Sequence, residues 1–340
     1  MSKLSLQGKY WFVLGLTLAL SVLVMYVSVT NGTFDISATD VLRTLFRMNS
    51  SKEYDLVIFD FRLPRIVIGA LVGLGLGISG AVLQGITRNQ LADSGILGIH
   101  AAAGMAIVLF MFIFRGTTGA HWLSTMAMPI FGWLGGLGAV FLLLLFARQQ
   151  GGLDPQRLIL VGIALGLGFG AITLYISLKM DPQDFEMATV WLAGSIYSKN
   201  WLQIAAVLPW LVLLIPVIWW RAYKLNLLHL DEVSVSGIGL NVNRERMIFL
   251  LCCVGLVSAC VSVSGSIGFV GLIAPHIARR LVGIQYKYIL PVCGAIGMLM
   301  VLVGDFIGKT IFAPAELPVG IVISIIGVPY FIYLLFKKRK

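Results

Sequence analysis

Apolar stretches close to membrane length recur along almost the whole chain. A helix needs about 20 apolar residues to cross the ~30 Å hydrocarbon core of a bilayer. Ten stretches approach this length: 11–30, 66–83, 95–114, 127–147, 158–178, 202–220, 246–263, 267–282, 289–308 and 318–336. The sequence therefore predicts an all-α, polytopic integral membrane protein with about ten transmembrane helices.

The composition excludes a water-soluble protein of this size. Hydrophobic residues make up 59% of the chain and charged residues 12%, whereas soluble domains contain about 25% charged residues. The net charge of +10 is then a signal of topology, because basic residues in short loops are retained in the cytoplasm. Ten crossings place both termini on one side, and cytoplasmic termini put most Lys and Arg residues inside. Nucleic-acid binding is excluded as well, since it requires a soluble basic face.

No Pro- or Ser-rich linker divides the chain, which is interpreted as a single transmembrane domain over residues 1–340. Two polar segments interrupt it, an external loop at 31–65 and a cytoplasmic loop at 221–246. The cytoplasmic loop separates halves of opposite orientation, and such inverted halves are a known transporter architecture. The first segment is expected to remain as a helix, because its apolar run is longer than a signal-peptide core and Tyr26–Asn31 offers no cleavage site.

The external loop contains an amphipathic stretch, DISATDVLRTLF. Its apolar residues Ile36, Val41, Leu42 and Leu45 are spaced to share one side of a helix. This pattern predicts a short helix that lies on the membrane surface.

Glycine, with 38 residues, is the expected packing device between helices. Small residues at every fourth position let neighbouring helix backbones approach closely. Two stripes have this spacing: Gly69, Gly73 and Gly77, and Gly162, Gly166 and Gly170. The four cysteines fall inside predicted helices without a Cys-x-x-Cys pair, and are expected to be buried apolar side chains: Cys252, Cys253, Cys260 and Cys293.

Catalytic and metal-binding patterns are missing from the sequence. Gly75, Gly77 and Gly80 satisfy G-x-G-x-x-G, but they lie in an apolar helix instead of a βαβ unit. Gly308–Thr310 imitates the end of a P-loop, yet Val303 stands where its first glycine belongs. We therefore predict no catalytic residue, no metal site, no cofactor and no ATP-binding site in this chain.

Three separated motifs carry a resemblance that spans roughly residues 60–336. They are RLPR (Arg62–Arg65) leading into SGAVLQGITRNQLADSGILGI (Ser79–Ile99), then SIGFVGLIAPHIARR (Ser266–Arg280), and AELPVG (Ala315–Gly320). Together they resemble permease subunits of binding-protein-dependent ABC importers, in the FecCD-type family that takes up ferric siderophores, haem and cobalamin. Gln90 departs from this pattern, since the family usually has proline there.

The resemblance implies a multi-pass permease subunit in a bacterial cell (inner) membrane, with no enzymatic activity of its own. Its implied partners are a second permease, identical or homologous, two cytoplasmic ATPase subunits that hydrolyse ATP, an extracellular or periplasmic substrate-binding protein, and membrane lipid. The implied cargo is an iron chelate, with a ferric siderophore favoured and haem or cobalamin as alternatives.

Two groups of site residues follow from the resemblance. The loop LDEVSVSGIGLNV resembles the segment that couples the family's permeases to the ATPase, which assigns coupling to Leu230, Glu232, Ile238 and Gly239. Docking of the binding protein's carboxylates is assigned to Arg62, Arg65 and Lys309, with anchoring to lipid headgroups as the alternative. Lys309 stands where the family mostly has arginine, so a forked contact becomes a single point charge there.

A stand-alone secondary transporter is the alternative from another class. Such a protein would carry ionisable residues at mid-membrane as coupling sites. Asp305 is the only acidic residue within the predicted spans, and it lies near the outer end of its helix. This alternative is therefore disfavoured.

Overall fold

The computed structural model describes residues 5–32, 36–48, 51–114, 121–149, 152–153, 155–230, 232–237, 239–313 and 315–336. Within these residues the regular secondary structure is helical apart from two short paired strands, β1 (Arg148–Gln149) and β2 (Gly152–Leu153). Seven helical segments there are long and apolar enough to cross a membrane: Leu6–Thr30, Lys52–Thr87, Met126–Ala147, Arg157–Ser177, Trp201–Trp220, Val242–Ser264 and Tyr286–Ile311. The prediction of a helical, polytopic membrane protein is confirmed, whereas the number ten stays a prediction.

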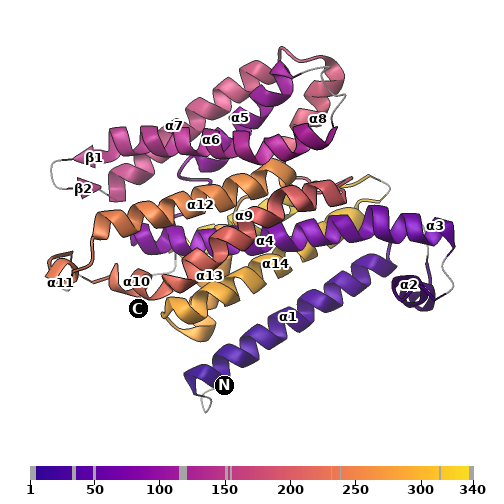
Figure 1. Cartoon of the computed structure of the whole chain (residues 1–340), viewed down its shortest axis with the longest axis horizontal. Helices are drawn as coiled ribbons and strands as arrows, with labels where there is room; N and C mark the ends of the chain where they lie inside the picture. The colour runs from indigo at the N-terminus through magenta and orange to yellow at the C-terminus, as the bar shows by residue number, and fades with distance from the viewer. Residues whose placement is uncertain are drawn as a thin grey trace.

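The long helices run in roughly one direction (Figure 1). In chain order the helices are α1 (Leu6–Thr30), α2 (Ala38–Leu45), α3 (Lys52–Asp55), the π-helix η1 (Leu56–Arg62), α4 (Leu63–Thr87), α5 (Ile99–Ile113), α6 (His121–Ala147), α7 (Pro155–Ser177), α8 (Pro182–Leu192), α9 (Trp201–Trp220), α10 (Ala222–Leu227), α11 (Glu232–Gly237), α12 (Val242–Ser264), α13 (Val270–Val282), α14 (Tyr286–Ile311) and α15 (Val319–Phe336). Helices α5 to α8 form a layer of their own beside the others.

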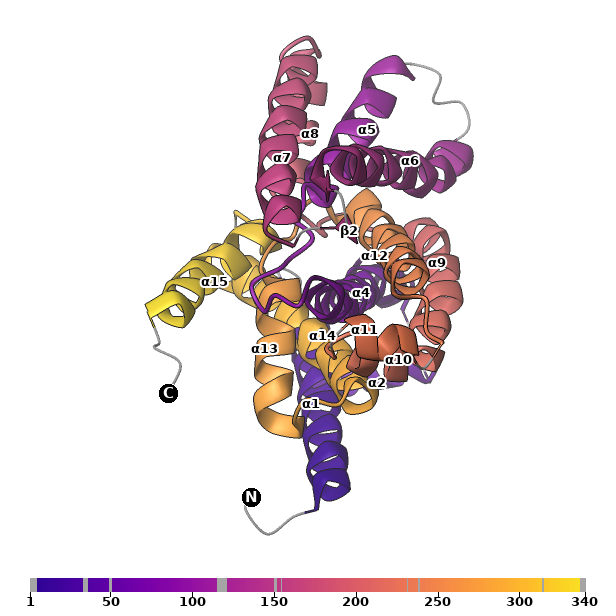
Figure 2. The same cartoon turned by 90° about the vertical axis from the view of Figure 1, so that its left-hand side faces the viewer.

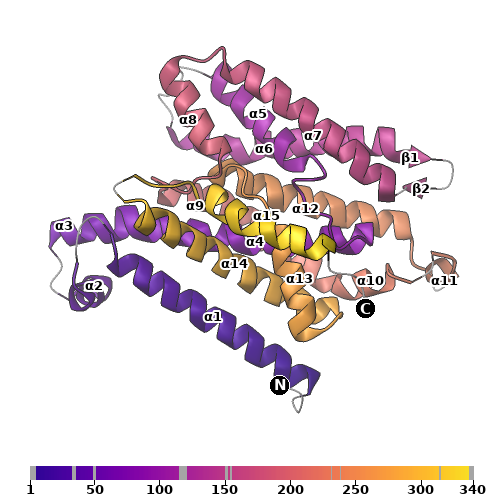
Figure 3. The same ribbon diagram turned by 180° about the vertical axis from the view of Figure 1, so that it is seen from behind.

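The two ends of the bundle are distinct. Helices α2 and α3 lie at one end, which we call the α3 end (Figures 1 and 3). Helices α10 and α11 lie at the other, the α11 end, together with the start of α1 and the last turn of α15. Seen along the bundle in Figure 2, α4 lies at the centre, surrounded by α9, α12, α13 and α14.

The helical segment that contains α4 begins much earlier than its hydropathy indicates. The sequence predicts a loop up to residue 65, but α3, η1 and α4 form one continuous helical segment, Lys52–Thr87. Ser51 caps its start, with its Oγ accepting from the backbone N of Tyr54 at 3.2 Å. Hydropathy misses these first turns because they contain the polar residues Lys52 and Glu53. Such residues lower the mean hydropathy but are compatible with a helix.

The glycine stripe of α4 faces α14. A Cβ added at Gly73 would lie 2.3 Å from the carbonyl oxygen of Gly297, and one added at Gly77 would lie 2.3 Å from that of Cys293. The two backbones are thus in direct contact, and Gly69 faces Ile196 nearby.

The stripe on α7 behaves differently along its length. A Cβ at Gly162 would lie 2.8 Å from the Cα of Leu97, and one at Gly166 would lie 3.5 Å from the Cα of Gly98. At Gly170 nothing lies within 4 Å of the added Cβ. Among the residues that the structure describes, the packing role predicted for Gly170 is therefore not found.

Helices α5 and α13 are shorter than the predicted spans 95–114 and 267–282. At 1.5 Å per residue their 15 and 13 residues cover about 22 Å and 20 Å. Irregular backbone precedes each, and His100 connects the two segments: its Nε2 lies 2.8 Å from Ser94 Oγ and its Nδ1 lies 3.2 Å from Ser266 Oγ. Irregular backbone among apolar helices persists only where protein groups satisfy it.

Helix α2 divides its apolar residues between protein and surroundings. Ile36 and Val41 are buried in a cluster that includes Val29 and Ile58. Leu42 and Leu45 are exposed. The predicted surface helix exists, but only part of its apolar side is available to lipid, because α1 and η1 cover the remainder.

Candidate docking and coupling sites

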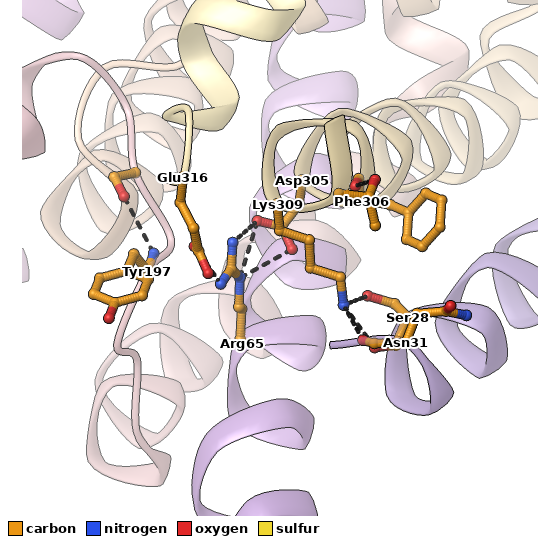
Figure 4. Close-up of polar contacts among 10 residues, drawn as sticks. Ser28, Asn31, Arg65, Tyr197, Asp305, Phe306, Lys309 and Glu316 are labelled. Atoms are coloured by element: carbon orange, nitrogen blue, oxygen red, sulfur yellow. Dashed lines mark hydrogen bonds and ion pairs between the residues drawn. The ribbon is translucent and has the colours of Figure 1, made fainter. Parts of the chain in front are cut away.

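Arg65 occupies the centre of a polar cluster at the α3 end (Figure 4). Its Nε donates to both carboxylate oxygens of Asp305 at 3.0 Å, and its Nη2 donates to Oδ1 at 2.8 Å. Its Nη1 donates to Glu316 Oε2 at 2.7 Å. The side chains of Arg65 and Asp305 are 15% and 6% exposed, so this forked pair joins α4 to α14 largely out of contact with solvent.

Lys309 binds the last turn of α1 (Figure 4). Its Nζ donates to the carbonyl oxygen of Ser28 at 2.7 Å, to Ser28 Oγ at 2.9 Å and to the carbonyl oxygen of Asn31 at 3.1 Å. Arg62 donates to the carbonyls of Val29 and Thr30 in the same turn. Carbonyls at a helix C-terminus have no backbone partner and attract cations. Arg62 and Lys309 thus cap α1.

The structure brings the three predicted docking residues to one end of the bundle, and each makes contacts inside the chain. The sequence missed Asp305 and Glu316 as partners of Arg65. A signal for Asp305 was present, since an acidic residue in an apolar helix requires a cation. Exposed basic side chains at this end include Arg43 and Arg47, which are 65% and 70% exposed.

A further contact at the α3 end follows from the π-helix. In η1 the backbone N of Leu63 donates five residues back, to the carbonyl of Ile58. The next donor in this ladder would be Pro64, which has no N–H, so the carbonyl of Phe59 lacks a backbone partner. The indole Nε1 of Trp201 donates to that carbonyl at 2.8 Å, which ties the start of α9 to η1.

At the α11 end, Arg88 follows the last residue of α4 in a left-handed conformation with φ 52°. Its Nε donates to the carbonyl of Leu228 and its Nη2 to the carbonyl of Leu230, both at 2.7 Å. Between these carbonyls, the His229 ring stacks on Tyr286 with centroids 5.7 Å apart. Burial and the charges of Arg279 and Arg88 lower the pKa of His229.

A second cluster joins α9 and α10 to α12. The buried carboxylate of Glu245 accepts from Arg221 Nη1 at 2.8 Å and 3.0 Å, and from Lys224 Nζ at 2.5 Å. The segment 221–246, predicted as a loop, is mostly helical. The contacts of Glu245 with Arg221 and Lys224 join its two ends.

The predicted coupling residues lie on and around α11. Leu230 precedes this helix and is 52% exposed. Glu232 is its first residue, and Gly239 follows it with φ +82° and nothing within 4 Å of an added Cβ. Ile238 lies outside the described residues. Val235 is buried and attaches the helix to the bundle.

These features define a multi-pass helical membrane protein with charged clusters at both ends. Among the described residues, no group of three or more His, Cys, Asp or Glu side chains could hold a metal ion. The four cysteines are buried and free.

Residues 19–337 match the FecCD transport family, and the chain belongs to this family. It is 52% identical to the iron-uptake system permease protein FeuC of Bacillus subtilis (strain 168), over 96% of this chain and 97% of that protein. It is 42% identical to the iron(3+)-hydroxamate import system permease protein FhuG of the same organism, over 98% of each chain. A solved structure described as an inward-facing conformation of a metal-chelate type ABC transporter has a TM-score of 0.81 and 29% identity, over 96% of this chain and 99% of that chain.

Proposed function

We propose that this protein is the permease subunit of an ABC importer that takes up an iron chelate, with a ferric siderophore as the favoured cargo. The observation that carries the proposal is the family match over residues 19–337, together with permease relatives named for iron uptake and iron-hydroxamate import. Haem and cobalamin are the alternative cargoes. ATP hydrolysis would belong to a partner ATPase.

The proposed topology has ten crossings, inverted halves and cytoplasmic termini, in one permease domain of residues 1–340 in a bacterial cell membrane. The α11 end is then cytoplasmic and the α3 end external. In support, the start of α1 and the last turn of α15 lie at the α11 end. The shorter α5 and α13 would complete their crossings with the irregular segments that precede them.

Coupling to the ATPase is proposed for the segment around α11. A short helix with exposed apolar residues suits a groove on a partner. Leu230 is exposed, and the space around Gly237 and Gly239 is open. Leu230, Glu232, Ile238 and Gly239 are the residues we assign to this contact.

The second permease subunit is proposed to pack on α7 and α15. Only 11% of the apolar window of α7 is buried within this chain, the lowest share among the seven long apolar segments of the described residues. Nothing lies within 4 Å of a Cβ added at Gly168 or Gly170, so a helix of another subunit could pack closely there. A shallow pocket beside α15, lined in part by Ser266 and Ser324, is a candidate for part of the path.

Docking of the binding protein is proposed for the α3 end, with Arg62, Arg65 and Lys309 retained as candidates. Their internal contacts set a condition on this role. A carboxylate of the binding protein could reach Arg65 only by sharing it with Glu316 or replacing Glu316, whose side chain is 31% exposed. Arg43 and Arg47 are more accessible cations for the first encounter.

Reconstituted transport tests the function. The permease, its ATPase and its binding protein would be incorporated into proteoliposomes, and uptake of radiolabelled ferric siderophore, haem and cobalamin compared. We expect uptake of one iron chelate that requires both ATP and the binding protein. Uptake driven by an ion gradient without ATP would identify a secondary transporter instead.

A further inference from the structure

We propose that Arg88 and Tyr286 form a clamp that fixes the root of α11, residues 226–230, to the paired helices α4 and α14. The clamp makes Arg88 a positioning residue: displacement of α11 is delivered to α4 and α14 instead of being absorbed by the connecting chain. This inference rests on the proposed contact between α11 and an ATPase.

The first half of the clamp is the guanidinium of Arg88. Leu228 follows α10 directly and Leu230 stands two residues before α11, and their carbonyls accept from Nε and Nη2 of Arg88 at 2.7 Å each. One rigid fork thus holds two carbonyls of the short link between α10 and α11. The left-handed backbone of Arg88 ends α4 and turns its side chain toward this link.

The second half is contributed by the first residue of α14. The backbone N of Tyr286 donates to Asn226 Oδ1 at 3.0 Å, and its hydroxyl lies 3.2 Å from His229 Nε2. The Tyr286 side chain is buried and lies against Gly85 of α4, where an added Cβ would be 2.8 Å from its hydroxyl. Residues 226–230 are therefore attached to α4 and α14 at several points.

Helices α4 and α14 are suited to move as one body. Their backbones touch at Gly73 with Gly297 and at Gly77 with Cys293, so no side chain separates the two helices at these contacts. At the α3 end the forked pair of Arg65 and Asp305 joins them again. A displacement at the clamp is thus carried along the bundle toward the proposed docking end.

Beyond its root, α11 is attached to the bundle by the buried Val235, whereas Gly237 at its end is open. An added Cβ at Gly237 would meet nothing within 4 Å, so this position tolerates a cysteine. A spin label at Gly237→Cys, in a background with the four native cysteines replaced by alanine, reports how firmly α11 is held. The variants are Arg88→Met, Arg88→Lys and the control Arg280→Met, an exposed arginine of α13 outside the clamp.

We expect Arg88→Met to raise the mobility of the label in the permease in nanodiscs. In the complex with native cysteines it should lower transported cargo per ATP hydrolysed by about fivefold, since it removes two hydrogen bonds from a charged donor. Arg88→Lys should give intermediate values in both measurements, because a single ammonium group on a shorter side chain replaces the forked guanidinium. Arg280→Met should match the unmodified protein in both measurements.

Unchanged label mobility in Arg88→Met, or unchanged transport per ATP with the complex assembled, would overturn the clamp. Failure of the unmodified chain to associate with any ATPase would overturn the proposed function instead. In that case the label measurement, which needs only the permease, still decides whether Arg88 holds α11.

Discussion

Trp201 donates its indole N–H to the carbonyl of Phe59, at 2.8 Å, where Pro64 cannot supply a backbone donor. The contact depends on the π-helical ladder of η1, because an α-helical ladder would direct the missing N–H of Pro64 to Asp60 instead. A side chain of α9 thus completes the hydrogen bonding of a helix about 140 residues earlier in the sequence.

Trp201→Phe should lower the free energy of unfolding by about 1 kcal/mol, since the ring is kept while the hydrogen bond to Phe59 is lost. Thermal unfolding in nanodiscs measures the change. Trp220→Phe is the matched control, because Trp220 is 85% exposed. Equal stability of the two variants would show that the indole contact contributes nothing.

Asp305→Asn should lower the free energy of unfolding by about 3 kcal/mol, because it leaves the largely buried Arg65 without its forked carboxylate. The control is Asp60→Asn, which changes an exposed carboxylate. Replacing both partners, as Arg65→Met with Asp305→Leu, should recover part of the loss, since no buried unpaired charge then remains and Glu316, which also loses Arg65, is 31% exposed. A double variant less stable than Asp305→Asn would contradict this account.

Glu316→Gln should strengthen association with the binding protein by about two- to fivefold, because Arg65 then loses a competing carboxylate at an exposed position. The measurement is the rate and salt dependence of association with the permease in nanodiscs. Glu53→Gln serves as a control for simple loss of negative charge at the same end. If the two variants bind alike, Arg65 does not receive a partner carboxylate.

Gly73→Ala should destabilise the bundle by about 1–3 kcal/mol, because its Cβ would meet the backbone of α14 at 2.3 Å. Gly170→Ala should leave the isolated permease unchanged, since nothing lies within 4 Å of its Cβ. In the assembled transporter Gly170→Ala tests the proposed contact of α7 with a second permease. Unfolding of the two variants is compared first in monodisperse permease and then in the complex.

Much of the protein follows from its sequence alone. Runs of apolar residues near membrane length require a polytopic helical protein, because only paired backbone is stable in lipid. The motifs at Arg62–Arg65, Ser266–Arg280 and Ala315–Gly320 are local patterns, and they identified the family without any knowledge of contacts. The spacing of Gly73 and Gly77 predicted a close helix contact, although not the identity of the neighbour.

Only the tertiary structure decided which groups meet. The pairing of Arg65 with Asp305 joins residues 240 positions apart, and the clamp of Arg88 on Leu228 and Leu230 spans about 140. Local pattern indicates that a buried charge needs a partner but not which residue supplies it, since this depends on how the helices pack. For the same reason, the predicted docking residues were found in contacts within the chain. Their charge is visible in the sequence, whereas the groups that they contact depend on the fold.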